Sequence, residues 1–596
     1  MLNKKTYSFI CLFTFSFILF SCASNSVRNQ KKVTENNYYH TNQGSKIRPV
    51  VGTKGMVVAD DEIAAKWGVE ILKRGGNAID AAVATAFAMA VTRPHYAALG
   101  GGGFLVYCPK PKNNQPSDCS IIDYREQAPS AAHRDMYLIG GKARTDLSQD
   151  SPLGAGVPGT TAGLLLALKK FGTKSRKEIL SRPIQLAQRG FSFTGQLEVA
   201  ANNRWSVMND AAKLIFGCAK GKKVPSQPCE PGDVLRQKDL ARVLRQVSAG
   251  GSNGFYRGWV AKRLSRGISN SGGIINQKDL ASYRAIQREP VSAFFRGNEI
   301  VTMPPPSAGG VTMLQMFQYA EKAHQQGGFE EGFGSSKSIH SLVHSMSLAF
   351  ADRAKHFGDP DYYSVPIKEL LSKRYLDRQW KSTFKLSKAS LPKNAGVVVP
   401  KEGNHTTHFS VIDKEGNAVS ITTTVNNYFG SGFVPPGTGV VMNDEMDDFS
   451  MQPGVPNMFG LVGAEANAIE PYKRPLSSMS PTIVRDKNGN NLLVIGASGG
   501  PRITTSVFLS LFNRLYFGMS LPDAVNAQRF HHQWKPKVVF LERFGFSADT
   551  RNVLLDMGYE VKETTGCGRI HALERLPNGR TWGVPDHRAE GVAVAE

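Results

Sequence analysis

One ten-residue stretch, 404–413, constrains the fold of this chain more than any other. Its sequence, Asn-His-Thr-Thr-His-Phe-Ser-Val-Ile-Asp, places the apolar residues Phe409 and Val411 two positions apart, which is the period of a strand in a packed sheet. Lys414–Gly416 then predicts a three-residue hairpin loop, with glycine where a left-handed conformation is wanted. We expect Ala418–Val425 to form the returning strand.

The register of this hairpin decides which side chains meet. If Asp413 pairs with Asn417, then Thr406 lies opposite Thr424, and Asn426 lies two residues further along on the same face. A β-bulge in either strand would shift this pairing by one residue. The register therefore predicts two facing threonine hydroxyls with an amide side chain beside them.

A threonine at position 406 supports chemistry only if a base is supplied. A threonine hydroxyl is a poor nucleophile, but a threonine at a chain terminus can use its own α-amine as the base. The pKa of a free α-amine, roughly 7.7–8.0, suits that task. An internal Thr406 would have to be freed by cutting the His405–Thr406 bond. Taken alone, Thr-Thr-His is more simply interpreted as the start of a strand.

The charge of the chain narrows the classes of partner. The formal net charge is +23 over 596 residues, of which 41% are hydrophobic and 20% charged. Nucleic-acid binding would gather basic residues beside aromatic ones, whereas Lys and Arg are spread along this chain. We expect no nucleic-acid partner, and a basic surface that faces anionic envelope components or acidic substrates.

Two short patterns suggest ligands but lack the residues that would complete a site. Gly100–Gly103 is a glycine run, yet no Gly-Lys-Ser/Thr follows it, so tight backbone packing explains it better than a nucleotide does. His405 and His408 are three residues apart and His531–His532 are adjacent, but neither pair has a completing carboxylate or a His-Glu-x-x-His pattern. We expect no metal and no cofactor.

The first 49 residues have the composition of an export signal and a tether. Two lysines precede an apolar run at 9–20, which predicts a secretory signal in 1–21, too short for a membrane-spanning helix. The Leu-Phe-Ser-Cys sequence that ends at Cys22 resembles a bacterial lipobox, which makes Cys22 a candidate lipid anchor; the alternative is a soluble secreted protein. Residues 22–49 are rich in Asn, Ser, Thr and Lys and predict a disordered tether.

Five cysteines follow Cys22. Cys108 and Cys119 are eleven residues apart, as are Cys218 and Cys229. In an oxidising compartment the economical prediction is two local disulfides, with Cys567 left unpaired. Together with the export signal, this pattern predicts a protein of the bacterial cell envelope, either periplasmic or anchored at the outer membrane, and otherwise secreted.

Hydrophobic periodicity predicts mainly helices between the first strands and the Thr406 hairpin. Asp60–Arg74 has one apolar face, and Asn77 can cap a second helix, Ala78–Val91, whose alanines indicate close burial. Further helices are expected at Ala162–Phe171, Arg182–Arg189, Gln237–Ala249, Ser338–His356 and Ser372–Trp380. The composition of Trp205–Pro231 predicts a loop-rich insertion. The Pro- and Gly-rich segment Pro304–Gly310 is predicted to be irregular and to line one side of the Thr406 site.

Several long motifs accompany the Thr406 segment in a fixed order. They are Leu99–Phe104, Asp123–Glu126, Val157–Thr160, Pro304–Gly310, Asn443–Phe449, Arg474–Thr482, Gly496–Gly500 and Arg529–Trp534. From about Val50 to the C-terminus, this order and spacing resembles the γ-glutamyltranspeptidases (γ-glutamyltransferases) of the N-terminal-nucleophile hydrolase superfamily. The resemblance implies a four-layer αββα sandwich of the α/β (α+β) class, built jointly from a large subunit, 50–405, and a small subunit, 406–596, of one precursor.

The resemblance also implies the catalytic residues. The precursor would cut itself at His405–Thr406, and the freed Thr406 would act as the nucleophile, oriented by the hydroxyl of Thr424. The backbone N–H groups of Gly499 and Gly500 would stabilise the developing oxyanion. No cofactor or metal is implied.

The resemblance further implies how a γ-glutamyl group is recognised. Arg125 would hold the α-carboxylate in a bidentate fork that lysine cannot reproduce, assisted by Ser477 and Ser478. The α-ammonium would be held by Asn426, Glu445 and Asp448. Phe459 would lie in a lid loop over the substrate, at a position where many family members carry tyrosine.

The function implied is removal of the γ-glutamyl group of glutathione and related amides through a Thr406 acyl-enzyme, followed by transfer to water, an amino acid or a peptide. One alternative is an enzyme of the same fold, either an acylase or a poly-γ-glutamate hydrolase or transpeptidase; Arg125 with Ser477 and Ser478 argues instead for a substrate with a free α-carboxylate. The alternative from another class is a surface-binding lipoprotein without enzymatic activity.

Overall fold

The computed structural model describes residues 48–111, 117–219, 221, 223–389 and 405–596. The predicted signal at 1–21, Cys22 and all but the end of the predicted tether therefore lie outside the described residues. The polar segment that directly precedes His405 lies outside them as well. In the part that is described, no helix combines the length and the apolar character needed to cross a membrane.

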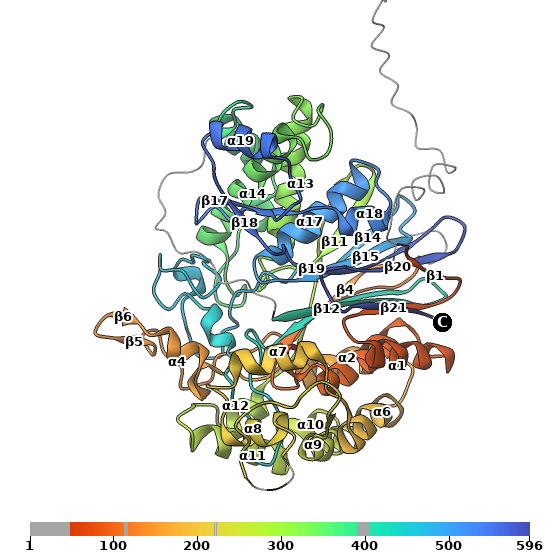
Figure 1. Ribbon diagram of the computed structural model, residues 1–596, viewed down its shortest axis with the longest axis vertical. Coiled ribbons are helices and arrows are strands. Elements are labelled where there is room, and N and C mark those ends of the chain that lie inside the picture. The colour runs from red at the N-terminus through yellow and green to blue at the C-terminus, as the bar shows by residue number, and fades with distance from the viewer. Residues whose placement is uncertain (1–47, 112–116, 220, 222, 390–404) are drawn as a thin grey trace, which may run out of the picture.

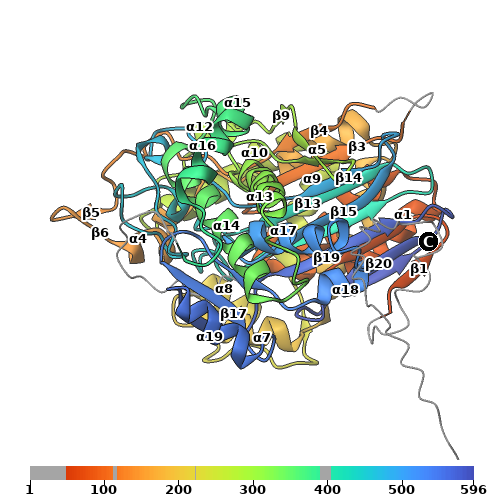
Figure 2. The same cartoon turned by 90° about the horizontal axis from the view of Figure 1, so that it is seen from above.

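Two seven-stranded antiparallel sheets are stacked face to face and covered by helices on both outer faces (Figures 1 and 2). This confirms the predicted αββα sandwich. In order across the first sheet, the strands are β21 (Val592–Ala595), β2 (Met56–Ala59), β12 (Thr406–Ile412), β13 (Ala418–Thr424), β3 (Gly102–Cys108), β4 (Ser120–Asp123) and β9 (Ile286–Arg288). In the second they are β1 (Val50–Gly52), β20 (Thr581–Pro585), β19 (Arg569–Arg575), β15 (Asn491–Ser498), β14 (Thr482–Arg485), β11 (Asn298–Thr302) and β10 (Val291–Phe295).

The helices form the two outer layers. Below the first sheet in Figure 1 lie α1 (Glu62–Lys73), α2 (Ala78–Thr92), α6 (Arg176–Arg189), α7 (Gly195–Arg204), α8 (Asp210–Phe216), α9 (Lys238–Gly250), α10 (Ser252–Tyr256), α11 (Gly258–Ser269) and α12 (Gln277–Ser282). Helix α5 (Thr160–Phe171), labelled in Figure 2, packs against α2. Above the second sheet lie α13 (Gly309–Gln325), α14 (Ser336–His356), α17 (Arg502–Leu515) and α18 (Leu521–Asn526).

The remaining elements lie outside the two seven-stranded sheets. They are α3 (Pro94–Ala97), α4 (Thr145–Gln149), α15 (Ile367–Leu370), α16 (Lys373–Thr383), α19 (Ala548–Asp556), the small sheet β16 (Phe530–His531), β17 (Val538–Glu542) and β18 (Glu560–Thr564), the two-stranded pairs β5 (Leu138–Ile139) with β6 (Lys142–Ala143) and β7 (Phe191–Ser192) with β8 (Val234–Leu235), and the 3-10 turns at Pro152–Gly154, Glu445–Asp448 and Glu465–Asn467.

The Thr406 hairpin has the predicted register. Thr406 pairs with Thr424 and Ile412 with Ala418, without a bulge between them. Every residue of β12 and β13 is buried, because β12 is flanked by β2, β13 is flanked by β3, and the second sheet and α2 cover the two faces. A strand with this much burial on both faces has its register strongly specified by packing.

All seven predicted helices are present, but the start of one of them was wrong. Helix α2 is buried along its whole length and begins at a capping box between Asn77 and Asp80, as expected for an alanine-rich core helix. Helix α6 begins at Arg176, six residues before the predicted start, because Ser175 caps it and Pro183 is accommodated inside it. The irregular Pro304–Gly310 segment ends in α13, which starts at Gly309. The loop-rich insertion at 205–231 contains the short helix α8.

His408 is part of the core between the two sheets. Its ring lies against Gly496 of β15, where an added Cβ would come within 2.3 Å of the imidazole. Its two nitrogens bond to the hydroxyls of Thr422 and Ser410, at 2.9 and 3.0 Å. Burial lowers the pKa of His408 well below its usual value, so the ring is neutral and serves packing between the sheets.

Each sheet contains strands from before and from after residue 406. In the first sheet β2 lies between β21 and β12, while β3 pairs with β13. In the second sheet β1 pairs with β20 and β11 pairs with β14. The chain before Thr406 and the chain after it therefore share both sheets and cannot be separate domains with separate cores.

The two predicted disulfides are present. Cys108 at the end of β3 is joined to Cys119 beside β4, and Cys218 after α8 is joined to Cys229. Cys567 is unpaired and buried, and burial raises the pKa of its thiol to about 12. Since the thiolate is the reactive form, this cysteine is chemically inert in the folded protein.

The two disulfides and the buried Cys567 predict a simple alkylation pattern for protein isolated from an oxidising compartment. Iodoacetamide should modify none of the five cysteines of the folded chain beyond residue 48, and after unfolding without reductant it should modify Cys567 alone. Peptide mapping of the non-reduced protein measures this directly. Free thiols at Cys108, Cys119, Cys218 and Cys229 would contradict the assignment.

Candidate active site

Thr406 is the first residue of β12 and is only 7% exposed. Its hydroxyl lies 3.3 Å from the hydroxyl of Thr424 on the paired strand. The Thr424 hydroxyl also accepts the backbone N–H of Asn426 at 2.9 Å, and Asn426 is held in a left-handed conformation, with φ 74°, that asparagine tolerates. The strand end therefore fixes the Thr424 hydroxyl in place beside Thr406.

The Thr424 hydroxyl also reaches the bond that precedes Thr406. It donates to the carbonyl oxygen of His405 at 3.2 Å. The His405 ring stands edge-on to Tyr428, with 4.1 Å between ring centroids, and burial lowers the pKa of His405 to about 3, which leaves it neutral. A hydroxyl donor on this carbonyl would stabilise negative charge on its oxygen if the carbonyl carbon were attacked.

A small pocket opens beside Thr406. It is lined by Arg125, Arg353, Thr406, Thr424, Asn426, Glu445, Asp448, Phe459, Leu461, Leu476, Ser477, Ser478, Met479, Gly500, Pro501 and Ile503. The free space is only about 20 Å³, which is room for roughly one water molecule. A substrate side chain can therefore enter only if one of the covering groups moves.

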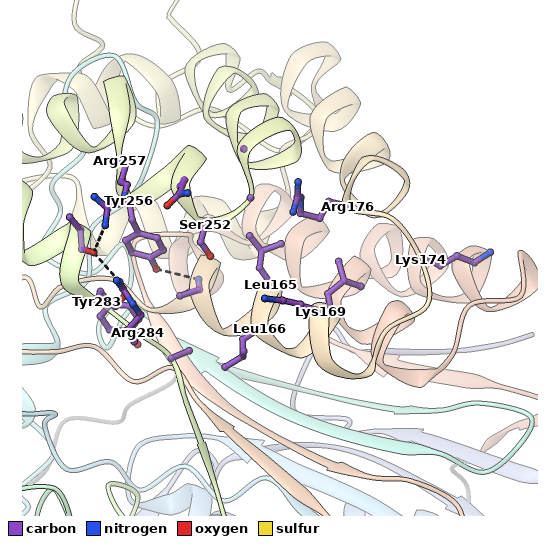
Figure 3. Close-up of a pocket in the computed structure, with 17 residues that line it drawn as sticks. Leu165, Leu166, Lys169, Lys174, Arg176, Ser252, Tyr256, Arg257, Tyr283 and Arg284 are labelled. Atoms are coloured by element: carbon purple, nitrogen blue, oxygen red, sulfur yellow. Dashed lines mark hydrogen bonds between the residues drawn. The ribbon is translucent and has the colours of Figure 1, made fainter.

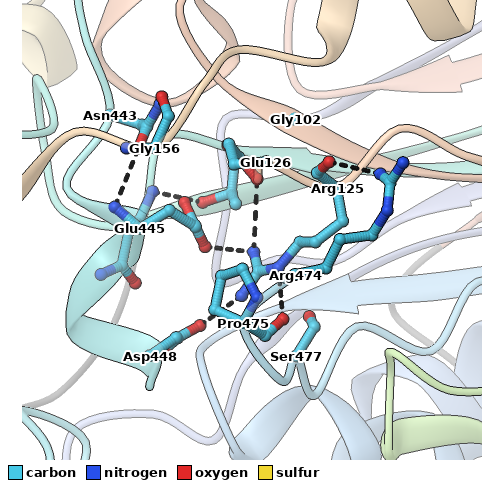
Figure 4. Close-up of polar contacts among 12 residues, drawn as sticks. Gly102, Arg125, Glu126, Gly156, Asn443, Glu445, Asp448, Arg474, Pro475 and Ser477 are labelled. Carbon is cyan, nitrogen blue, oxygen red and sulfur yellow. Dashed lines mark hydrogen bonds and ion pairs between the residues drawn. The ribbon is translucent and has the colours of Figure 1, made fainter. Parts of the chain in front are cut away.

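Arg125 lines this pocket and is fully buried, and its polar contacts are drawn in Figure 4. Its guanidinium forms ion pairs with Glu445 and with Asp448, the latter at 2.6 Å between Nη2 and Oδ2. Its Nε donates to the carbonyl of Pro475 at 3.1 Å. The backbone carbonyl of Arg125 accepts from Arg474 at 2.7 Å. Side chain and backbone are thus both fixed, and the fork already faces two carboxylates.

Three carboxylates surround this single arginine. Besides Glu445 and Asp448, Glu126 is fully buried, and one of its oxygens lies 3.7 Å from Nη1 of Arg125. Burial raises the pKa of all three carboxyl groups, that of Glu126 to about 7, against the opposing effect of Arg125. Neither oxygen of Glu126 has a hydrogen-bond partner. The cluster therefore favours a protonated Glu126 near neutral pH.

The two predicted serines line the same pocket as Arg125. Ser477 is held by a backbone hydrogen bond from its N–H to Pro306 at 2.9 Å, which puts the Pro304–Gly310 segment beside the site as expected. Ser478 accepts a hydrogen bond from Arg353 of α14 at 3.4 Å. Sequence reasoning missed Arg353, because the chain gives no local signal that brings α14 to this turn.

Gly499 and Gly500 follow β15 directly and both have positive φ, 134° and 58°. Among the described residues, the backbone N–H groups of these two glycines have no hydrogen-bond acceptor. Gly500 lines the pocket, whereas Gly499 lies one residue outside the lining. Free, fixed N–H groups beside a hydroxyl are what an oxyanion requires.

Phe459 covers the pocket from the loop that follows the acidic turn. Its ring lies against Gly500, where an added Cβ would be 3.0 Å from the ring, and it is 6% exposed. Gln533, from the Arg529–Trp534 motif, donates to the carbonyl of Phe459 at 3.1 Å. Phenylalanine lacks the hydroxyl that tyrosine would offer as a latch, and this backbone contact holds the loop in place.

The pocket thus gathers ten of the predicted site residues, with His405 and Gly499 adjacent to it. Their roles stay predictions. Gly496–Gly500 also fits the Gly-x-Ser-x-Gly pattern of serine hydrolases, but within the described chain Ser498 is buried in β15 and has no hydrogen bond to a histidine. The geometry favours Thr406 as the nucleophile.

A larger hollow of about 570 Å³ lies elsewhere, between α5 and the helices α10 and α12 (Figure 3). Its basic lining residues are Lys169, Lys174, Arg176, Arg257 and Arg284, and none of its lining residues is acidic. It offers cations but no nucleophile paired with a base, so it does not compete with the Thr406 pocket as a reaction site.

Comparison with known proteins gives concordant results. The family model described as gamma-glutamyltranspeptidase matches residues 64–596. A glutathione hydrolase proenzyme of Pseudomonas sp. (strain A14) is 42% identical over 88% of this chain and 89% of its own length. That of Escherichia coli (strain K12) is 40% identical over 91% of each. Among solved structures, a cephalosporin acylase from Bacillus halodurans superimposes with a TM-score of 0.78 at 25% identity, over 93% of this chain and 97% of that one.

The raised pKa of Glu126 predicts how stability depends on pH. A carboxyl group whose pKa rises from 4.5 to about 7 on folding stabilises the fold below pH 4.5, and this contribution is lost as the pH rises through 7. Glu126→Gln, which mimics the protonated form, should therefore gain stability relative to wild type between pH 5 and pH 8, by up to about 3 kcal/mol. Thermal denaturation midpoints at both pH values measure this.

Glu369, which is exposed, supplies the matched control, because Glu369→Gln should leave the difference between the two pH values unchanged. A Glu126→Gln variant that tracks wild type at both pH values would show that Glu126 is ionised in the fold throughout this range.

Proposed function

Because this chain belongs to the gamma-glutamyltranspeptidase family, we propose that it is a self-cleaving γ-glutamyltransferase and glutathione hydrolase. It removes the γ-glutamyl group of glutathione and related γ-glutamyl amides and passes it to water, an amino acid or a peptide. The observation that carries this proposal is the Thr424 hydroxyl, which lies 3.3 Å from the Thr406 hydroxyl and 3.2 Å from the His405 carbonyl oxygen. One fixed group thus touches both the nucleophile and the bond to be cut.

Maturation starts from this arrangement. The Thr406 hydroxyl oxygen attacks the carbonyl carbon of His405, the peptide C–N bond breaks, and the hydroxyl proton passes to the departing nitrogen. Water then hydrolyses the resulting ester, which gives a carboxylate at His405 and a free α-amine at Thr406. The products are the large segment, up to His405, and the small segment, 406–596, which stay paired through the two shared sheets.

Catalysis reuses the same threonine. The free α-amine of Thr406 accepts the hydroxyl proton as the oxygen attacks the γ-carbonyl carbon of the donor. The N–H groups of Gly499 and Gly500 bind the oxyanion, and the leaving amine takes the proton. Water or an acceptor amine then attacks the γ-glutamyl ester and restores the hydroxyl. These steps use only groups of the protein and its substrates.

Recognition rests on the buried charges. Arg125, with Ser477 and Ser478, binds the α-carboxylate of the donor, and Glu445, Asp448 and Asn426 bind its α-ammonium. Without substrate, Arg125 is paired with Glu445 and Asp448. A zwitterionic donor brings one charge of each sign, so both sides can exchange one partner for another without leaving a buried charge unpaired.

We also propose a location for the protein from its N-terminal sequence and its cysteines. An export signal at 1–21 and a lipid anchor at Cys22 would place the enzyme in the bacterial cell envelope, and the two disulfides support an oxidising compartment. The Phe459 lid, which has no hydroxyl to latch it, would set the balance between water and amine acceptors.

Substitution of Thr406 tests the proposal. Thr406→Ala should leave one uncut, inactive chain, because the hydroxyl serves both in maturation and in turnover. Thr406→Ser should still be cut, more slowly, since its hydroxyl remains. Intact-mass spectrometry and a denaturing gel measure both. Normal cutting of the alanine variant would refute the mechanism, and an uncut wild-type chain would favour the surface-binding lipoprotein.

Substitution of Arg125 tests substrate recognition. Loss of one partner of a buried charged contact costs a few kcal/mol, so Arg125→Ala should lower kcat/KM on γ-glutamyl-p-nitroanilide at least about a hundredfold. Arg125→Lys should lose nearly as much, because an ammonium cannot reproduce the fork. Asp448→Ala should be similarly impaired, and all three variants should still cut themselves. Unchanged activity in Arg125→Ala would favour the acylase or poly-γ-glutamate alternative.

A further inference from the structure

Arg353 on α14 is a second arginine in the Thr406 pocket. It is 6% exposed and lines the same small space as Thr406 and Thr424. Burial lowers the pKa of its guanidinium to about 10, so the side chain is still a cation at neutral pH. The pocket thus holds two buried positive charges, and only Arg125 was expected.

The two arginines differ in how well they are satisfied. Arg125 has two carboxylate partners and donates to two backbone carbonyls. Arg353 has one long hydrogen bond, from Nη2 to the Ser478 hydroxyl at 3.4 Å. Its Nε has no partner, and in the part of the chain that is described no carboxylate oxygen lies within 4.0 Å of its guanidinium. A buried cation in this state is incomplete without an anion.

The contact with Ser478 determines which way that serine can donate. A serine hydroxyl has one hydrogen to give and two lone pairs to accept with. A guanidinium carries only N–H donors and no acceptor atom, so Arg353 must be the donor in this hydrogen bond. The Ser478 hydroxyl hydrogen is therefore free to point to a different acceptor, and Ser478 lines the pocket.

The charge balance of the pocket indicates what that acceptor is. Arg125 is already balanced by Glu445 and Asp448, with Glu126 beside them. A donor substrate adds a further carboxylate to a region that has three acidic groups around one arginine. Arg353 is attracted by the charge of Asp448, which opposes the effect of burial on its pKa, but among the described residues it has no ion pair of its own. Its charge can therefore offset the added carboxylate.

We propose that Arg353 is a positioning residue for the α-carboxylate of the donor substrate, which orients the Ser478 hydroxyl toward it and supplies its second positive charge. This inference rests on the proposed function, because it concerns how a γ-glutamyl donor is held. It makes the site selective for acyl donors with a free α-carboxylate rather than for simple amides. The competing role is mechanical, in which Arg353 only ties α14 to the Ser477–Ser478 turn.

Paired substrates separate these two roles. γ-Glutamyl-p-nitroanilide carries the α-carboxylate and the α-amine, whereas 4-aminobutanoyl-p-nitroanilide lacks only the carboxylate. Arg353→Ala should lower kcat/KM on the first substrate by at least about tenfold, mainly through KM, since charged hydrogen bonds are at stake. On the second substrate the loss should stay within about threefold. A mechanical role would lower kcat/KM on both substrates by the same factor, and that result would overturn the proposal.

Two further measurements keep the test decisive. Competitive inhibition by L-glutamate and by 4-aminobutanoate gives the same comparison if the second substrate turns over too slowly, and Arg353→Ala should weaken only L-glutamate. Ser478→Ala should show the same carboxylate-dependent loss, and the double variant should be little worse than either single variant. Arg353→Lys should recover part of the loss.

Controls separate failure of this inference from failure of the proposed function. Lys355 is exposed on the same helix, and Lys355→Ala should match wild type on both substrates. All variants should be cut at Thr406, as a denaturing gel will show. Wild-type protein that is cut but releases no p-nitroaniline would count against the proposed function. Active wild type with an equal loss on both substrates in Arg353→Ala would count against Arg353 alone.

Discussion

The antiparallel pairing of β12 with β13 is the constraint on which the site depends, because it fixes Thr406 opposite Thr424. A shift of one residue would turn one of these hydroxyls to the other face of the sheet. Packing prevents such a shift. Every side chain of both strands is buried, and the His408 ring fits against Gly496 of the opposite sheet. The stacking of the two sheets thus holds the chemistry in register.

The second requirement is that Arg125 is paired with Glu445 and Asp448 before the substrate arrives. One arginine among three carboxylates would be unstable if all three were ionised, and burial shifts the pKa values toward protonation. The cluster also leaves little empty space. A ligand therefore enters by replacing existing contacts rather than by filling a void. This favours selectivity over affinity, because an incorrect ligand leaves a buried charge unpaired.

Much of this arrangement could be predicted from the sequence, where the determinants are local. The hairpin register follows from strand period and loop length, and the buried α2 follows from its alanines and the Asn77 cap. Features set by distant parts of the chain could not be predicted. Arg353 reaches Ser478 across 125 positions and Gln533 reaches Phe459 across 74, and no spacing rule relates such residues. The early start of α6 was missed, although Ser175 caps the helix and it continues through Pro183.

Because both sheets contain strands from before and after residue 406, the arrangement affects the kinetic stability of the protein. If the chain is cut before Thr406, the mature molecule consists of two polypeptide chains that folded as a single chain. Once unfolded, the pieces would have to find each other in solution and interleave again, a route that the intact chain never used. The active form would then be preserved by a high barrier to unfolding rather than by reversible equilibrium, so its lifetime is a matter of rate.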